Sequence, residues 1–242
     1  MEKRLVLIKG FAKTNKESNT MDYFLDAYVQ YFMSNAGGAW LRSEIIMLNT
    51  PTVKSLVAVL GTPSLEFILS VFIGHGGAQN SVQLFQLNKA EVIEAGQFII
   101  DSAKQLLIFE SCRSNVAMIP TIDLSSKPPK FQKGGVVRKA LSKAEVREVF
   151  KDYISSLKNG YQVYFACDIS EVASNFIFTK SLLSYLMNWH SDKANHLCYN
   201  SVGLVNSKVR PLVNAKSLQE TSKEQRPQVV GTIDVPLVIS RY

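Results

Sequence analysis

QLLIFESCRSN, residues 105–115, is the stretch of sequence from which the fold of this chain can be inferred. It is apolar from Leu106 to Phe109 and then changes abruptly to small and polar residues around Cys112. A short apolar run with such an ending is typical of a buried parallel strand that runs into a loop. Because ligands of open α/β sheets bind beyond the carboxyl ends of the strands, Cys112 lies where a reactive group is expected.

A second stretch, LEFILSVFI at residues 65–73, has the same form and is followed directly by Gly-His75-Gly-Gly. Glycines at a strand end let the backbone approach a ligand closely. A thiol and an imidazole at neighbouring strand ends can act as nucleophile and base. Each residue alone also has an ordinary structural role, the cysteine as a small buried hydrophobe and the histidine as a hydrogen-bonded polar group. It is their matched placement that makes His75 and Cys112 a candidate catalytic pair.

The rest of the chain alternates between strand-like and helix-like segments. Pattern and turn residues predict further strands at 4–8, 41–48, 82–87, 161–167 and 229–239, and helices at 20–34, 50–61, 89–98, 142–157, 176–189 and, weakly, 199–219. Pro211 is expected to break or start a segment within the last of these. This alternation predicts an α/β fold with a mostly parallel central sheet and helices on both faces.

Composition excludes several classes of protein. The chain has 242 residues, of which 46% are hydrophobic and 19% charged, so a sizeable core is expected and disorder is not. No apolar run approaches the roughly 18 residues of a membrane helix, and the first ten residues predict a strand rather than a signal peptide. Three cysteines do not form a disulfide framework, so we expect a cytoplasmic protein with available thiols.

The formal net charge of +7 is concentrated between residues 127 and 151, a segment that contains eight basic residues and only two acidic ones. Such a patch suits an acidic partner, or it is an ordinary solvated surface, which we favour because no nucleic-acid motif accompanies it. We therefore expect no nucleic-acid or membrane partner. Residues 115–141 lack a regular period and contain several prolines and glycines, which predicts a long loop within a single domain spanning 1–242.

The motifs resemble those of caspases and metacaspases. FIGHGG, residues 72–77, is similar to their strand-end Gly-His-Gly, and FESCRS, residues 109–114, to their nucleophile motif. YFACD at 164–168 followed by IFTKSLL at 177–183 resembles the later strand and helix of bacterial caspase-like domains, and RPQVVG at 226–231 resembles their C-terminal segment. The resemblance covers almost the whole chain and implies a three-layer sandwich.

Three departures separate the chain from animal caspases. Ser114 stands where caspases carry glycine, Glu110 replaces their glutamine or aspartate, and His75 and Cys112 are 112 − 75 = 37 residues apart instead of about 50. They favour a bacterial caspase-like protein and leave both residues of the pair in place.

The resemblance implies a cysteine endopeptidase in regulated proteolysis or defence. Cys112 would attack the scissile carbonyl, His75 would carry the proton, and the backbone N–H groups of Gly76 and Cys112 would bind the oxyanion. A silent caspase-like interaction or sensing module is the alternative. A nucleotide-binding domain is disfavoured because no glycine-rich phosphate loop follows the first strand.

In metacaspases an acidic residue after the later strand helps to select arginine or lysine, and Asp168 occupies that position; it can equally cap the following turn. Glu110 is a candidate for orienting the histidine or for a salt bridge. The substrate is expected to be a protein or peptide, and pairing through the last strand would give a homodimer, with an activating partner as another possibility. We expect no cofactor and no metal, because His190, His196 and Cys198 lack a fourth ligand.

Overall fold

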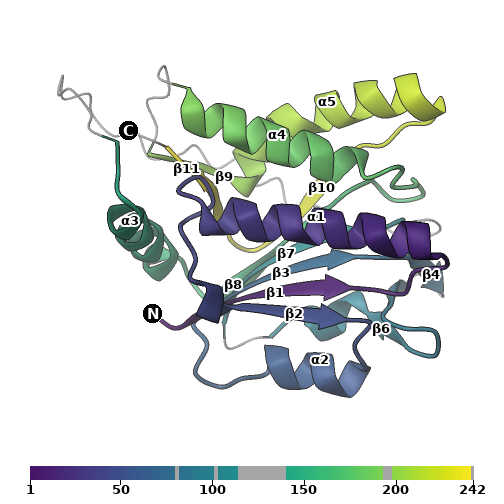
Figure 1. Ribbon diagram of the computed structural model, residues 1–242, viewed down its shortest axis with the longest axis horizontal. Coiled ribbons are helices and arrows are strands. Elements are labelled where there is room, and N and C mark those ends of the chain that lie inside the picture. Colours follow the sequence, from purple (N-terminus) through teal and green to yellow (C-terminus); the bar gives the residue numbers. More distant parts are fainter. Residues whose placement is uncertain (80–81, 101–102, 114–139, 193–197, 241–242) are drawn as a thin grey trace.

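The central feature of the computed structural model is a six-stranded sheet with the order β10-β8-β7-β3-β1-β2 (Figure 1). The structure describes residues 1–79, 82–100, 103–113, 140–192 and 198–240. Five neighbouring strands are parallel, and β10 alone is antiparallel, at one edge. The strands of this sheet are β1 (Lys3–Lys9), β2 (Ile45–Asn49), β3 (Phe67–Ile73), β7 (Lys104–Glu110), β8 (Gly160–Phe165) and β10 (Gln228–Gly231).

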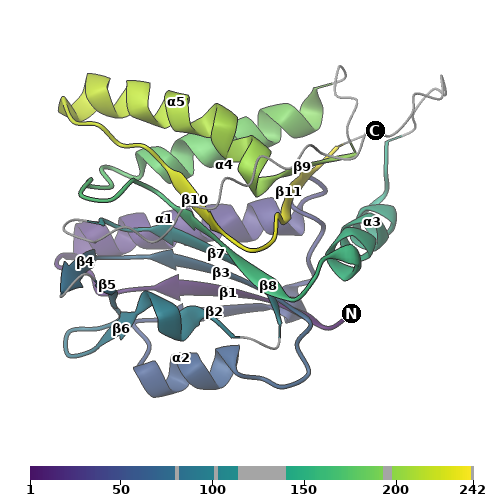
Figure 2. The same ribbon diagram turned by 180° about the vertical axis from the view of Figure 1, so that it is seen from behind.

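Helices cover both faces of the sheet, and the expected α/β sandwich is confirmed (Figures 1 and 2). One face carries α1 (Asn15–Met33), α4 (Ile177–Ser191) and α5 (Val202–Thr221), and α3 (Lys143–Ser156) adds its apolar side to the same core. The opposite face carries α2 (Val53–Leu60), the 3-10 helix η2 (Ala95–Phe98) and a small sheet of β4 (Gly76–Gln79), β5 (Val82–Gln86) and β6 (Val92–Glu94). The remaining elements are η1 (Arg42–Glu44) and the pair β9 (Tyr199–Ser201) and β11 (Pro236–Ile239).

Alternate residues of the inner strands serve two separate cores. Leu5 and Leu7 of β1 pack under α1 and α4, whereas Val6 and Ile8 face α2 and η2. Every residue of β3 is buried. Strands buried on both faces need apolar side chains at every position, which is why these segments read as continuous apolar runs rather than as alternating ones.

The largest difference from the sequence prediction is the start of α1. The helix begins at Asn15, ahead of the expected start at Thr20. The hydroxyl of Thr14 accepts a hydrogen bond from the backbone N–H of Glu17 at 3.1 Å and so caps the first turn. The pattern Thr14-x-x-Glu17 is the usual signature of such a helix start.

Three further expectations are wrong. Residues 89–98 are not a helix, because β6 and η2 occupy most of the segment. Pro211 lies inside α5 instead of ending it, since the helix is held on both sides of the proline by buried Val205, Val209 and Val213. The last strand region divides into β10 and β11, which belong to different sheets. Most of the long loop expected at 115–141 lies outside the described residues.

Candidate active site

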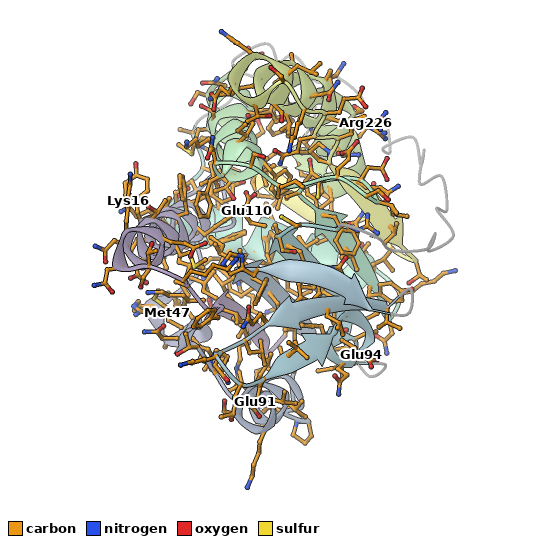
Figure 3. The ribbon with its side chains drawn as sticks, turned by 90° about the vertical axis from the view of Figure 1, so that its right-hand side faces the viewer. Lys16, Met47, Glu91, Glu94, Glu110 and Arg226 are labelled. Atoms are coloured by element: carbon orange, nitrogen blue, oxygen red, sulfur yellow. The ribbon has the colours of Figure 1, made fainter. Side chains whose placement is uncertain are left out.

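The loops that carry His75 and Cys112 leave the sheet side by side. In the parallel pair β3–β7, Ile73 is aligned with Glu110, so each candidate lies two residues beyond the end of its strand. The Gly74 backbone N–H also donates to the carbonyl of Glu110 at 3.3 Å. Figure 3 faces the edge of the sheet at which the strands end, with Glu110 near its centre between Lys16 of α1 and Arg226. The placement expected for both loops from their strands is therefore present in the structure.

The two loops touch at Gly76. A Cβ atom at this position would lie 2.6 Å from the carbonyl oxygen of Cys112 and 2.9 Å from Oγ of Ser111. Both distances are shorter than a van der Waals contact, so any side chain at position 76 would push the loops apart. The Cys112 carbonyl is also fixed from β5, because Gln83 donates its side-chain amide to it at 3.2 Å. Glycine at position 76 is thus required by the close packing of the histidine and cysteine loops.

His75 and Cys112 both line one cavity of about 760 Å³ at this edge of the sheet. Its walls come from the start of α1 and the residues before it, the two strand ends with their loops, the start of α4 and the segment before it, and one residue of α5. Charged side chains of both signs surround it: Lys13, Lys16, Lys180, Glu17, Glu110 and Glu220. The cavity has space for a peptide side chain and is open to solvent beside both candidate catalytic groups.

The Cys112 thiol is half buried, with Sγ 3.8 Å from the carbonyl oxygen of Ala173. Burial raises the pKa of the Cys112 thiol above its ordinary value, and the nearby Glu110 acts in the same direction. The contact with Ala173 and the charge of Lys13 oppose this rise in pKa without cancelling it. The thiol is therefore protonated at neutral pH, and its reaction with an electrophile requires a base to accept the proton.

The His75 ring faces a carboxylate that the sequence prediction did not include. Nε2 of His75 lies 3.0 Å from Oε1 of Glu17, in the first turn of α1. This contact depends on the helix beginning at Asn15, because the expected start at Thr20 left Glu17 outside the helix. The helix-start signature at Thr14 was the signal in the sequence that could have placed it.

Comparisons with known proteins agree with this architecture at the level of the fold. No protein-family model matches the sequence, and no curated protein matches it. Among solved structures, caspase-1 from Spodoptera frugiperda aligns with a TM-score of 0.59 at 7% identity, over 100% of this chain and 92% of that chain. The Drosophila initiator caspase Dronc aligns with a TM-score of 0.53 at 11% identity, over 94% of this chain and 78% of that chain. This chain has a caspase-like fold.

Within the caspase-like fold, Glu110 is turned toward α4 and not toward His75. Its buried carboxylate accepts hydrogen bonds from the backbone N–H of Thr179 at 2.9 Å and from the Thr179 hydroxyl at 2.7 Å. Burial raises the pKa of Glu110 to about 7, although the hydrogen bonds from Thr179 act to lower it. Glu110 therefore ties the cysteine strand to the first turn of α4, and the structure does not give it the role of orienting the histidine.

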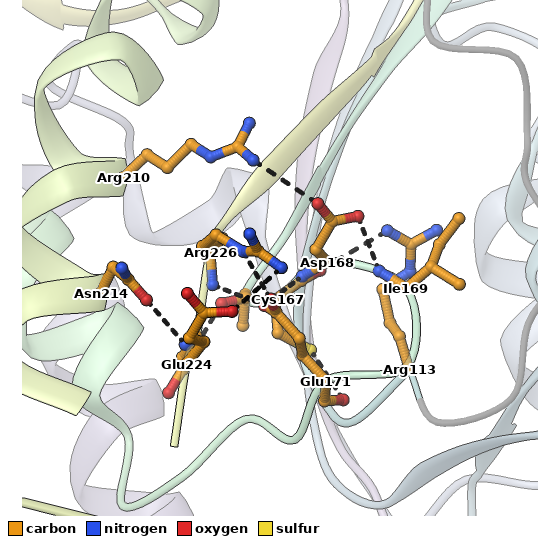
Figure 4. A network of polar contacts seen from close by, with 11 residues as sticks. Arg113, Cys167, Asp168, Ile169, Glu171, Arg210, Asn214, Glu224 and Arg226 are labelled. Carbon is orange, nitrogen blue, oxygen red and sulfur yellow. Dashed lines mark hydrogen bonds and ion pairs between the residues drawn. The ribbon is translucent and has the colours of Figure 1, made fainter. Parts of the chain in front are cut away.

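Asp168 lies away from the cavity, in the turn after β8 (Figure 4). Its Oδ1 accepts a hydrogen bond from the Ile169 N–H at 2.7 Å, and Oδ2 lies 3.5 Å from Nη2 of Arg210. It is not among the residues that line the cavity with His75 and Cys112. The structure thus brings together His75, Gly76 and Cys112 and leaves Asp168 in a neighbouring polar network.

That neighbouring network is centred on Glu171. Its Oε1 binds Nε of Arg226 at 2.7 Å, and its Oε2 accepts from the backbone N–H groups of Arg226 and Asp168 at 2.6 and 3.0 Å. The Glu171 carbonyl accepts from the Arg113 N–H at 3.2 Å, which fixes the residue that follows Cys112. The network therefore supports the cysteine loop through residues that do not line the cavity.

In the part of the chain that the structure describes, no three histidine, cysteine, aspartate or glutamate side chains converge as a metal site. No helix in the same ranges is both long and apolar enough to cross a bilayer.

Proposed function

We propose that this chain is a cysteine endopeptidase in which Cys112 is the nucleophile and His75 the base. The observation that supports this most is the contact of the two strand-end loops, where a Cβ at Gly76 would come within 2.6 Å of the Cys112 carbonyl. This contact brings an imidazole and a thiol to one cavity that is open to solvent. The caspase-like fold supports the same class of reaction by analogy alone.

In the proposed reaction, a peptide carbonyl binds beside Cys112 in the cavity. The S–H bond breaks, the proton moves to His75, and Sγ forms a bond to the carbonyl carbon while the carbonyl π electrons move to oxygen. Collapse of this adduct breaks the C–N bond, and His75 gives the proton to the leaving amine. Water then hydrolyses the thioester. Because the pKa of the Cys112 thiol is raised, His75 acts as a general base and not as the partner of a preformed thiolate.

The negative oxygen that forms during attack needs hydrogen-bond donors. We assign this role to the backbone N–H groups of Gly76 and Cys112, which belong to the two loops that touch. Removing one such donor typically lowers the rate about 10²–10³-fold. Glycine at position 76 is consistent with the role, because a backbone donor can reach the substrate oxygen only where no side chain intervenes.

The substrate is a protein or peptide in this proposal. Selection of arginine or lysine at the cleavage position by Asp168 stays a prediction, and the position of Asp168 outside the cavity weakens it. Acidic groups that do line the cavity are Glu17, Glu110 and Glu220. A role in regulated proteolysis or defence, and a homodimer or an activating partner, also remain predictions from the family resemblance.

The test is cleavage of a fluorogenic peptide panel with Arg, Lys, Asp or Leu at the cleavage position under reducing conditions. Wild type, Cys112→Ala and His75→Gln are compared, with Cys198→Ala and His190→Gln as matched controls outside the cavity. We expect Cys112→Ala and His75→Gln to lower the cleavage rate by roughly 10³-fold or more. The controls should retain it.

Cleavage that survives in Cys112→Ala would contradict the proposed function. If the wild type cleaves no peptide, the rate of iodoacetamide labelling at Cys112 separates two remaining cases. Labelling that is slowed by His75→Gln indicates a latent enzyme, since a working base accelerates loss of the thiol proton. Labelling that is independent of His75 indicates a silent caspase-like interaction module.

A further inference from the structure

Glu17 occupies a position from which it can act on the histidine. It lies in the first turn of α1, three residues after Thr14, and its backbone N–H is bound by the Thr14 hydroxyl. Its side chain lines the same cavity as His75 and Cys112. The helix start therefore places an acidic side chain directly over the loop that follows β3.

The two carboxylate oxygens of Glu17 have different partners. Oε2 accepts a hydrogen bond from the backbone N–H of Lys13 at 2.6 Å, which fixes the carboxylate to the chain before the helix. Oε1 is left to face Nε2 of His75 at 3.0 Å. A purely structural role at the helix start requires only the contact with Lys13, so it does not account for the second oxygen.

The contact between Glu17 and His75 is partly buried, but the angle at Nε2 is not that of a hydrogen bond. The two side chains are 28% and 31% exposed, which makes the pair stronger than one between fully exposed groups. The Nε2 atom itself is buried and has no correctly angled hydrogen bond to any described residue. The 3.0 Å separation between Nε2 and Oε1 is already that of a hydrogen bond, so rotation of the two side chains without closer approach completes the bond.

We propose that Glu17 is a positioning residue for His75, accepting a hydrogen bond from Nε2–H and leaving Nδ1 to exchange the proton with Cys112. A carboxylate on one ring nitrogen fixes the tautomer and orientation of the imidazole and stabilises the imidazolium that forms when the other nitrogen takes a proton. The inference rests on the proposed function, because it assigns Glu17 a part in the same reaction.

This role fits the state of the thiol. Cys112 keeps its proton at neutral pH because burial raises its pKa, so the reaction depends on how readily His75 accepts that proton. Glu110, the other acidic side chain close to Cys112, is held by Thr179. Glu17 is the carboxylate in the described cavity wall for which the structure gives a contact with the His75 ring.

The test uses the full-length protein and two substitutions, Glu17→Ala and Glu17→Gln. Asp26→Asn is the control, because it removes an exposed carboxylate from the same helix away from the cavity. Glutamine removes the charge and has one acceptor oxygen where glutamate has two, so it can accept from Nε2–H or from the Lys13 N–H but does not replace both contacts. A structural role alone would lower Tm without changing the state of the His75 ring, so Tm is measured for every variant.

The first readout is the ring N–H proton of His75 in the NMR spectrum of histidine-labelled protein. The chain has three histidines, and His75→Gln assigns the signal by removing it. In wild type we expect an Nε2–H signal protected from exchange with water. It should persist in Asp26→Asn, be less protected in Glu17→Gln and disappear in Glu17→Ala. An unprotected signal in wild type, or a protected one in Glu17→Ala, would overturn the inference.

The second readout applies if the wild type cleaves peptides. We expect Glu17→Ala to lower kcat about 10- to 100-fold, as for partners that orient a histidine in other sites, while KM changes less than about twofold. Glu17→Gln should lie between wild type and Glu17→Ala. An unchanged kcat in Glu17→Ala would reject the positioning role and leave the protease intact. If the wild type cleaves no peptide, the dependence of Cys112 labelling on His75 decides the proposed function, and the ring proton still decides the role of Glu17.

Discussion

The cavity and the neighbouring polar network lie at the same edge of the sheet, yet their buried carboxyl groups have different hydrogen-bond partners. Glu171 in the network accepts three hydrogen bonds, including one from the guanidinium of Arg226. Glu110 in the cavity wall is equally buried, but both of its hydrogen bonds come from the uncharged Thr179. The buried carboxylate of the network is thus matched by an opposite charge, whereas the buried carboxyl of Glu110 has only uncharged hydrogen-bond donors and a raised pKa.

The comparison also explains how the cysteine loop is held. On the network side, the Arg113 N–H donates to the Glu171 carbonyl, and on the cavity side Gln83 holds the carbonyl of Cys112. The thiol between these two anchors contacts only the Ala173 carbonyl among the hydrogen-bond partners in the described residues. The loop is therefore fixed through its backbone while the Cys112 thiol is left with few contacts, which is consistent with the proposed role of the thiol as nucleophile.

The largest effect is expected from Gly76→Val, which breaks the contact between the two loops. The added Cβ would come within 2.6 Å of the Cys112 carbonyl, so the loops must separate. We expect peptidase activity or Cys112 labelling to fall about 10²–10³-fold and stability to fall by roughly 1–3 kcal/mol. Gly77→Val is the control, because no described atom lies within 4 Å of its Cβ position. Equal losses in both variants would contradict the steric argument.

Glu171→Gln tests the network side of the comparison. Removing the charge leaves the Arg226 guanidinium and two backbone N–H groups with a weaker acceptor, and we expect a loss of about 2–4 kcal/mol in unfolding free energy. Glu224→Gln is the matched control, since Glu224 is 53% exposed and contacts the same arginine at 3.3 Å. Its loss should be below about 1 kcal/mol. Urea denaturation measures both, and similar midpoints for the two variants would show that the network is not a stabilising centre.

Glu110→Gln tests whether the pKa of the Glu110 carboxyl is raised, through the pH dependence of stability. The folded pKa of Glu110 is raised from 4.5 to about 7, so the folded state keeps its proton more firmly than the unfolded chain. Its contribution to stability is fully present below about pH 4.5 and is lost as the pH rises through about 7. As the pH rises from about 4.5 to about 7, the unfolding free energy of Glu110→Gln should therefore increase relative to that of wild type by about 1–3 kcal/mol. Urea midpoints across this range measure the difference, and a constant difference would contradict the raised pKa.

The sequence was sufficient to predict the inner strands of the sheet and the ends of β3 and β7, because these depend on local patterns. Every residue of β3 is buried, and continuous apolar runs of this kind identify a strand without knowledge of its neighbours. His75 and Cys112 follow such runs directly, so their meeting at one edge of a parallel sheet was predictable. The helix expected at 142–157 is present as α3, and the hydroxyl of Ser142 caps it by accepting from the N–H of Glu145.

Contacts between distant segments were not predictable. The pairing of Glu17 with His75 and of Glu110 with Thr179 joins residues 75 − 17 = 58 and 179 − 110 = 69 positions apart. Local patterns also gave the wrong element where tertiary packing decided the outcome, as in residues 89–98 and around Pro211 in α5. Acidic residues near the thiol could be identified from the sequence, but the partner of each carboxylate depended on how the helices pack.

Asp168→Asn gives the smallest expected effect and decides to which of the two regions Asp168 belongs. Because its carboxylate is held by the Ile169 N–H and lies 3.5 Å from a partly exposed Arg210, we expect a stability loss below about 1 kcal/mol. The ratio of cleavage after arginine to cleavage after leucine should then stay within about twofold of wild type, since a difference in pocket contacts is what changes such a ratio. Arg210→Gln serves as the control, as it removes the partner of Asp168 without changing an acidic group. A tenfold fall in the ratio for Asp168→Asn but not for Arg210→Gln would place Asp168 in the substrate pocket, as the family resemblance implies. The network and the cavity would then act as one site during cleavage.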